Sequence, residues 1–236
     1  MTPQTEITVN LERLIALANG ALYWPAREML IVADLHFEKG SHFAMKGVLL
    51  PPYDTRVTLT RLAATIREIK PASVVSLGDA FHDGGSEARI GAADAALLEQ
   101  IVSSVRWTWI LGNHDPAPPS RFGGAVEGAL LCGRLLFRHE AAAWFERGEI
   151  SGHFHPVARV RAETRLIRRR CFATDGERLV MPAFGAYAGG LNILDAAFDG
   201  VFRNDLTAWM IGRSGIYPFA ADRLLGDSRS SRRKTG

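Results

Sequence analysis

Cysteine is scarce in this sequence of 236 residues, which contains only Cys132 and Cys171. The two cysteines form no Cys-x-x-Cys pair, so the sequence indicates neither a thiolate zinc site nor a disulfide framework. A chain of this length can bury a large hydrophobic core without disulfides or a structural metal. The low cysteine content therefore favours a protein of the reducing cytoplasm.

Long apolar runs are also missing, since none approaches the roughly 18 residues of a membrane-spanning helix. No basic residue precedes Arg13, and Asn19 and Gly20 interrupt the apolar stretch Leu14–Leu22, which is atypical of a signal peptide. Hydrophobic residues make up 47% and charged residues 22% of the chain, which excludes a wholly disordered protein. We expect a globular protein with no membrane partner.

Most of the chain has no excess of either charge. The net charge is +3, but the last eight residues contain four basic residues and no acid, so the remainder has a net charge of −1. Overall basicity therefore does not indicate nucleic-acid binding, which must be argued from local patches. We expect a single domain over residues 1–227 and a basic, disordered tail over residues 228–236.

The first half of the chain alternates between predicted strands and helices. Apolar runs predict buried strands over Leu30–Ala33, Ser73–Leu77 and Trp107–Leu111. Helical spacing predicts helices over Thr55–Lys70 and Ile90–Val105. The second half favours short strands over Leu135–Arg138, Ile150–Gly152, Val157–Val160, Leu166–Cys171 and Leu179–Met181. This order predicts an α/β fold in which a second sheet packs on the first, with helices outside.

Polar side chains follow the predicted strands at their carboxyl ends, the edge where ligands bind in open α/β sheets. They form five blocks: Asp34-Leu35-His36, Gly78-Asp79, Gly112-Asn113-His114-Asp115, His139 and Gly152-His153-Phe154-His155. Carboxylate, amide and imidazole donors without thiolate suit Mn, Fe, Zn or similar ions. One block alone is usually a turn or an ordinary histidine, but five after successive strands indicate a metal site.

The order of these five blocks resembles the motif series of the calcineurin-like metallophosphoesterases. The resemblance implies a two-sheet β-sandwich flanked by helices, with four layers α/β/β/α, and two divalent metal ions. It further implies that one ion is held by Asp34, His36 and His155, the other by Asn113, His139 and His153, with Asp79 bridging them. His114 would lie beside the ions without binding them. Glu140 departs from the series, in which glycine often follows the fourth-block histidine.

Other segments resemble one bacterial subfamily, the ligase-associated DNA damage response endonucleases. They are Ala21–Pro25, Ala33–Gly40, Gly47–Asp54, Gly152–Val157 and Pro182–Leu191. The subfamily implies a manganese-dependent phosphodiesterase of DNA repair, associated with a DNA ligase, a helicase and a second nuclease. Mn²⁺ is then the expected metal, although Fe, Zn and Ni suit the same donors.

The implied reaction is hydrolysis of a phosphodiester by a hydroxide that two metal ions activate, with Asp34 and Asp79 as catalytic carboxylates. His114, hydrogen-bonded to Asp34, would protonate the leaving oxygen. Lys39 could contact a phosphate near the first block, and His82 could line the site or orient a ligand.

An arginine-rich segment offers a further candidate DNA contact. Arg159, Arg161 and Arg165 share a parity on a strand and would share one face. That face is either a phosphate-binding surface or a solvated edge strand protected by charge. The segment Phe184–Leu191 has the composition of a flexible flap, which we expect near the metal site.

Three functions remain open on the sequence alone. The first is a nuclease that acts on DNA, with single strands favoured. The second is a phosphoesterase that acts on a nucleotide or another small phosphate ester. The third is a non-catalytic interaction module on the same fold, which would be expected to have lost ligands.

Overall fold

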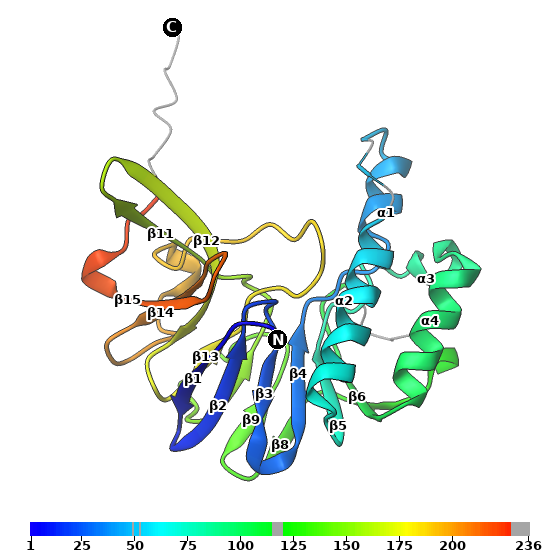
Figure 1. The fold of residues 1–236 in the computed structure, drawn as a ribbon, viewed down its shortest axis with the longest axis horizontal. Coiled ribbons are helices and arrows are strands. Elements are labelled where there is room, and N and C mark those ends of the chain that lie inside the picture. Colours follow the sequence, from blue (N-terminus) through cyan, green and yellow to red (C-terminus); the bar gives the residue numbers. More distant parts are fainter. Residues whose placement is uncertain (49, 52, 115–119, 228–236) are drawn as a thin grey trace, which may run out of the picture.

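The computed structural model describes residues 1–227 except 49, 52 and 115–119 (Figure 1). The predicted tail over residues 228–236 and Asp115 of the third block therefore lie outside the described residues. So do Leu49 and Pro52 of the segment Gly47–Asp54.

The first sheet has seven strands in sequential order from β1 to β7. Its antiparallel part begins with β1 (Gln4–Val9), β2 (Glu12–Leu17) and β3 (Leu22–Trp24), and β3 pairs with β4 (Met29–Ala33). From β4 onward the strands are parallel, through β5 (Ser73–Leu77), β6 (Arg106–Ile110) and β7 (Ala125–Glu127). The three central strands that were predicted are confirmed to within a residue at either end. Parallel strands end at the same sheet edge, which brings the first three polar blocks together.

The second sheet has the order β15-β14-β12-β13-β10-β9-β8, and β11 pairs with β12. Its strands are β8 (Leu130–Cys132), β9 (Leu135–Phe137), β10 (Glu149–Ser151), β11 (Val157–Ala162), β12 (Arg165–Thr174), β13 (Leu179–Val180), β14 (Thr207–Ile211) and β15 (Ile216–Ala220). Strands β9, β10 and β13 are parallel. The last two polar blocks follow β9 and β10, again at a shared edge.

The helices cover the outer face of the first sheet (Figure 1). They are α1 (Lys39–Met45), α2 (Asp54–Ile69), α3 (Ser86–Arg89) and α4 (Ala92–Ser103). Short 3₁₀ helices occur at η1 (Pro25–Arg27), η2 (Ser120–Phe122), η3 (Ala196–Phe198) and η4 (Ala221–Arg223). In the part of the chain that the structure describes, no helix combines the length and apolarity needed to cross a membrane.

Strand β4 shows how the sequence fixes the layers, because all five of its residues are buried. Leu30 and Val32 face the helices and pack in one cluster with Leu59 and Leu98. The alternate residues Ile31 and Ala33 face the second sheet and pack in another cluster with residues such as Phe137 and Phe172. A strand covered on both faces reads as an unbroken apolar run, as this one does.

A third apolar cluster covers the outer face of the second sheet, where residues 191–206 and η3 pack against it. Ile193, Phe198 and Val201 supply the contacts from this segment. The predicted two-sheet sandwich flanked by helices is confirmed, with α-helices on the first sheet and this segment on the second.

Candidate metal centre

Two groups of side chains meet where the carboxyl ends of both sheets come together. The first group consists of Asp34, His36 and His155, and the second of Asp79, His139 and His153. Within each group the potential ligand atoms lie within 4.8 Å of one another. Both groups take residues from both sheets, so neither sheet carries a complete group.

In the first group, the Nε2 atoms of His36 and His155 lie 3.2 Å apart, and His155 Nε2 lies 3.4 Å from Asp34 Oδ1. Asp34 is fully buried and accepts hydrogen bonds from the backbone amide of His153 at 3.2 and 3.0 Å. These bonds fix the carboxylate of the first sheet to the loop that carries the histidines of the second. His36 Nδ1 is buried and has no hydrogen-bond partner among the described residues.

In the second group, His139 lies between the two carboxylates. Its Nε2 is 3.4 Å from Asp79 Oδ1 and 3.1 Å from His153 Nδ1, and its Nδ1 is 3.6 Å from Asp34 Oδ1. The carbonyl oxygen of Leu77, at the end of β5, lies 3.1 Å from His139 Nδ1. The two groups are therefore in contact through Asp34 and His139.

The backbone at this site adopts a conformation that most residues avoid. Asp34, His36, Asp79, His153 and His155 all have positive φ, between 41° and 66°. This left-handed region is uncommon for residues other than glycine, although Asp and His tolerate it better than most. Such outliers persist where the surrounding structure over-determines them, and they concentrate at functional sites.

Two glycines allow this close packing. A Cβ on Gly78 would lie 2.3 Å from His139 Nδ1, and Gly78 also has a φ of 63°. A Cβ on Gly152 would lie 2.5 Å from Asp34 Oδ2. The glycines of the Gly-Asp and Gly-His-x-His blocks thus leave room for the side chains of other blocks.

Burial and charge shift the pKa values of the clustered groups. Burial, with a smaller contribution from His155, lowers the pKa of His36 to about 3. For His139, burial is the largest single influence and lowers the pKa, but Asp79 and Asp34 outweigh it and raise the value to about 9. Burial raises the pKa of Asp79, yet hydrogen bonds from His139 and the His114 amide leave it well below its usual value.

The donor set suits divalent cations. Each group offers one carboxylate and two imidazoles, which bind borderline and hard ions. Asp34 and Asp79 are buried, and among the described residues neither has a Lys or Arg within 4 Å. Buried charges are normally paired with an opposite charge or bound to a metal. The residues present therefore fit a metal pair.

Two residues of the third block lie at the rim. His114 is 52% exposed, its backbone amide donates to Asp79 Oδ1 at 2.9 Å, and its Nε2 lies 4.0 Å from Asp79 Oδ2. In the described residues His114 contacts Asp79 and not the expected Asp34, because the block follows β6 and its neighbour β5 carries Asp79. Asn113 is exposed, and its Nδ2 donates to Glu140 Oε2 at 3.4 Å.

His82 lies beside the first group. Its ring centroid is 5.5 Å from those of both His36 and His114, and its Nδ1 is buried without a partner in the described chain. Burial chiefly lowers the pKa of His82 to about 4, with a further contribution from the charge of Lys39. Burial also lowers the pKa of Lys39, which opens α1 and is half-buried.

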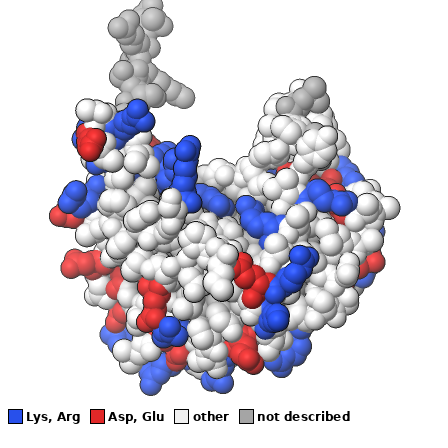
Figure 2. Space-filling view, viewed as in Figure 1, with Lys and Arg blue, Asp and Glu red and all other residues white. Residues whose placement is uncertain are grey.

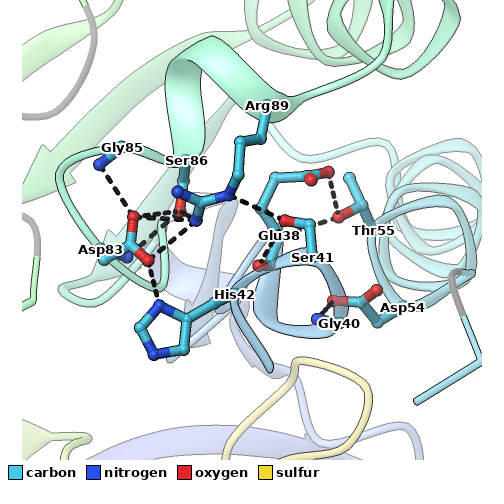
Figure 3. Close-up of polar contacts among 10 residues, drawn as sticks. All are labelled: Glu38, Gly40, Ser41, His42, Asp54, Thr55, Asp83, Gly85, Ser86 and Arg89. Atoms are coloured by element: carbon cyan, nitrogen blue, oxygen red, sulfur yellow. Dashed lines mark hydrogen bonds and ion pairs between the residues drawn. The ribbon is translucent and has the colours of Figure 1, made fainter. Parts of the chain in front are cut away.

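A polar network that the sequence did not predict lies behind His82. Asp83 pairs with His42 Nδ1 from α1 and receives Arg89 Nη2 from α3 at 2.8 Å (Figure 3). The His42 ring lies 4.6 Å from that of His82, centroid to centroid. Arg89 Nε also donates to Ser41 Oγ at 3.0 Å. His42 and Asp83 are 41 residues apart, and only the folded chain reveals their pairing.

The arginine-rich strands form a hairpin of β11 and β12. Arg159 lies opposite Arg168, and Ala162 lies opposite Arg165. Arg159 and Arg161 share a face of β11 as predicted, but Arg165 does not share it. The prediction is wrong for Arg165 because the chain turns at residues 163–164, and Arg165 begins the next strand on the opposite face.

The segment Phe184–Leu191, called the strap below, contacts the backbone next to two residues of the first group. Its amides at Phe184 and Gly185 donate to the carbonyl oxygens of Ala33 and Asp34 at 2.7 and 3.0 Å. A Cβ on Gly190 would lie 2.3 Å from the carbonyl oxygen of His155. The expected position near the site is therefore seen.

The model of the calcineurin-like phosphoesterase family matches residues 28–175, which include every member of both groups. The chain belongs to this family. Among solved structures, this phosphoesterase is similar to the Pseudomonas putida nuclease MPE, with 28% identity, a TM-score of 0.72 and coverage of 92% of this chain and 100% of that one. The chain is also similar to Yfce, a phosphoesterase from E. coli, with 14% identity, a TM-score of 0.42 and coverage of 81% of this chain and 98% of that one. No curated protein sequence matches significantly.

Family membership makes the chain a hydrolase of the metallophosphoesterase class. The similarity to a nuclease is consistent with the endonuclease subfamily that the sequence resembles.

Proposed function

We propose that this phosphoesterase is a metal-dependent endonuclease that cleaves DNA, with a preference for single strands, and that it acts in DNA repair. The observation that carries the proposal is the pair of Asp/His groups in contact at one sheet edge. The similarity to the Pseudomonas putida nuclease along 92% of the chain supports a nucleic-acid substrate. The subfamily resemblance supports a cytoplasmic location and association with a DNA ligase, a helicase and a second nuclease.

Bound divalent cations supply positive charge for the phosphate oxygens and an activated water for attack. We propose that one ion binds to Asp34, His36 and His155. The second would bind to Asn113, His139 and His153, and Asp79 would bridge the two. Mn²⁺ is the metal that the resemblance favours, and the carboxylate and imidazole donors suit it.

The chain itself must hold a proton for the leaving oxygen, and we propose that His114 does so. Its side chain is half-exposed, lies outside both groups and stays next to the site because its amide is anchored to Asp79. Its ring is stacked 5.5 Å from that of His82, centroid to centroid. A positioned imidazole of this kind contributes about 10²–10⁴-fold to a hydrolysis rate.

The phosphate groups of the substrate need further contacts from the chain. We propose Lys39 and His82 for the phosphate near the first group, because their side chains border His36. Arg159 and Arg161 are proposed for phosphates farther along the strand, as neighbours on one face of β11.

The role of His114 is tested with His114→Ala at saturating Mn²⁺. We expect cleavage of single-stranded DNA to fall by about 10²–10⁴-fold while the metal content, measured by atomic emission, is unchanged. His42→Ala is a comparison variant that removes an imidazole outside the two groups. Cleavage at the wild-type rate by His114→Ala would refute the assigned role.

The substrate class is tested by comparing single-stranded DNA, duplex DNA, a nucleoside monophosphate and a small chromogenic phosphodiester. A nuclease cleaves the DNA internally and yields fragments of intermediate length. Release of phosphate from the nucleotide without DNA cleavage would instead favour a phosphoesterase for small esters. Loss of every activity in His139→Ala controls for a contaminating enzyme.

A further inference from the structure

We propose that two adjoining arginine-lined pockets beside β12 form a tract that binds single-stranded nucleic acid and leads it to the metal centre. The proposal rests on the proposed function and deepens it, since it assigns the substrate path. The tract is distinct from the two Asp/His groups and from Lys39 and His82.

The first pocket lies between β12 and the strap, with a volume of about 340 Å³. It is lined on one side by Arg168, Arg169 and Arg170 and on the other by Ala188 and Gly189. Its remaining lining residues are apolar, and no acidic residue of the described chain contributes to it. The cavity therefore presents positive charge only.

The second pocket adjoins the first, because Arg169 lines both. It has a volume of about 230 Å³ and is lined by Arg161, Arg213 and the rings of Tyr217 and Phe219 on β15. Tyr217 is 48% exposed. Again no acidic residue lines it in the described part of the chain.

The arginines of the tract have no acidic partner to neutralise them. Arg168 donates to the carbonyl oxygen of Gly190 at 2.7 Å, Arg169 to that of Arg168 at 2.9 Å, and Arg170 to that of Ala183 at 2.6 Å. Among the described residues, none of the five arginines has a carboxylate within 4 Å. Neutral carbonyl groups orient the guanidinium groups but leave their charge available to a ligand.

The first pocket adjoins the metal centre through the chain itself. Val157, which lines the pocket, follows His155 by two residues, and its amide donates to the carbonyl oxygen of Leu191 at 2.8 Å. Gly190 packs on the carbonyl oxygen of His155, next to the lining residue Gly189. In Figure 2, Lys and Arg gather over the β11–β12 region and continue into the hollow between it and the helical side.

This combination of groups selects the ligand. Arg168 and Arg170 lie on one face of β12 and Arg169 on the other, and each arginine can bind one phosphate. Exposed aromatic rings bind the flat faces of unpaired bases, which in a duplex are already stacked. Arginine together with the exposed ring of Tyr217 therefore fits a single strand, whose bases and phosphates are both accessible. Phe219 is partly buried against the third apolar cluster.

The test measures, by anisotropy with the Mn²⁺-loaded full chain, the affinity of a fluorescein-labelled phosphorothioate oligothymidylate, which keeps the backbone charge and resists cleavage. We expect the double variant Arg169→Gln/Arg213→Gln to bind about tenfold more weakly. The slope of log affinity against log salt concentration should fall by about 1.4, since each phosphate contact on a single strand contributes about 0.7. Arg106→Gln is the matched control. Arg106 begins β6, at the end of the strand away from the metal centre, and the variant should bind like the wild type.

Base stacking is tested separately with Tyr217→Ala, for which Tyr217→Phe is the control. The alanine variant should lose about tenfold in affinity, and the phenylalanine variant should retain it. Wild-type affinity and salt slope in the arginine variant would overturn the tract. Cleavage of single-stranded DNA by the wild-type protein is measured in parallel. Its absence would refute the proposed function, whereas the binding data test the tract in either case.

Discussion

At the scale of single residues, the site depends on backbone positions that the surrounding structure must enforce. Asp34, His36, Asp79, His153 and His155 adopt left-handed conformations, each of which costs about 1–2 kcal/mol relative to the ordinary helical region. Hydrogen bonds such as those from the His153 amide to Asp34 help to hold them. We therefore expect small changes near these residues to alter metal binding before they alter the fold.

Gly152→Ala tests this expectation. The added methyl group would lie 2.5 Å from Asp34 Oδ2 and 3.0 Å from the Cβ of Ala33, so the carboxylate must move. We expect Mn²⁺ affinity, measured by calorimetry, to fall by about 10–100-fold, the range for disturbed ligand orientation. Gly91→Ala is the control, because its Cβ would meet nothing within 4 Å. Equal affinities in the two variants would show that Asp34 tolerates the displacement.

The position of the candidate ligands could be predicted at this scale because each polar block adjoins an apolar strand in the sequence. The partner of His114 could not be predicted, because it depends on which strand lies next to β6 in the sheet. The pairing of His42 with Asp83 likewise depends on how α1 and α3 pack. Local sequence locates side chains along the chain, and tertiary packing decides which of them meet.

At the scale of elements, strands buried on both faces were the easiest to predict. Strand β5 has the predicted bounds Ser73–Leu77, and α2 (Asp54–Ile69) differs from its prediction by one residue at each end. Strands β1 to β3 were not predicted, because polar and charged residues interrupt the apolar pattern of β1 (Gln4–Val9) and because β3 (Leu22–Trp24) has only three residues. Strands β14 and β15 were also not predicted; β15 is the edge strand and contains Pro218.

Asp83 forms ion pairs with His42 of α1 and Arg89 of α3, and these pairs give a prediction for the pH dependence of stability. Burial raises the pKa of Asp83, but Arg89 and His42 outweigh it and lower the value to about 2. A depressed carboxyl pKa adds stability above the unfolded value, and this stability is lost as the pH falls towards about 2. Because solvent screens this partly exposed pair, we expect Asp83→Asn to lower the free energy of unfolding by about 1 kcal/mol at pH 6.

Urea unfolding of wild-type protein and Asp83→Asn at pH 6 and near pH 3 measures this effect. The difference between the two proteins should shrink at the lower pH. Glu6→Gln, which removes an exposed partner of Arg13, is the control and should change stability little. A difference that stays constant with pH would contradict the ion pair.

At the scale of the whole molecule, the two sheets are joined by an apolar core and by the polar residues at its rim. Asp34 and Asp79 come from the first sheet, and His139, His153 and His155 from the second. A metal ion that binds side chains from both sheets binds the folded chain and not the unfolded chain. Metal binding is therefore expected to stabilise the entire fold.

Thermal unfolding with and without Mn²⁺ tests this expectation. At a metal concentration of about 100 times the dissociation constant, the added stability is about 2.7 kcal/mol. For a chain of this size that corresponds to a rise in Tm of roughly 5–10 °C, which a chelator should reverse. His139→Ala should show a smaller rise. An unchanged Tm with Mn, Fe, Zn and Ni alike would contradict a metal site between the sheets.

Each group combines residues from the first and the second sheet, and this has a consequence for synthesis on the ribosome. A nascent chain acquires Asp34, His36 and Asp79 early, but the first group is incomplete until His155 emerges, and the second until His153. A prematurely terminated product that stops before these histidines therefore carries no finished catalytic apparatus. Only a translation product that has passed His155 can form both groups.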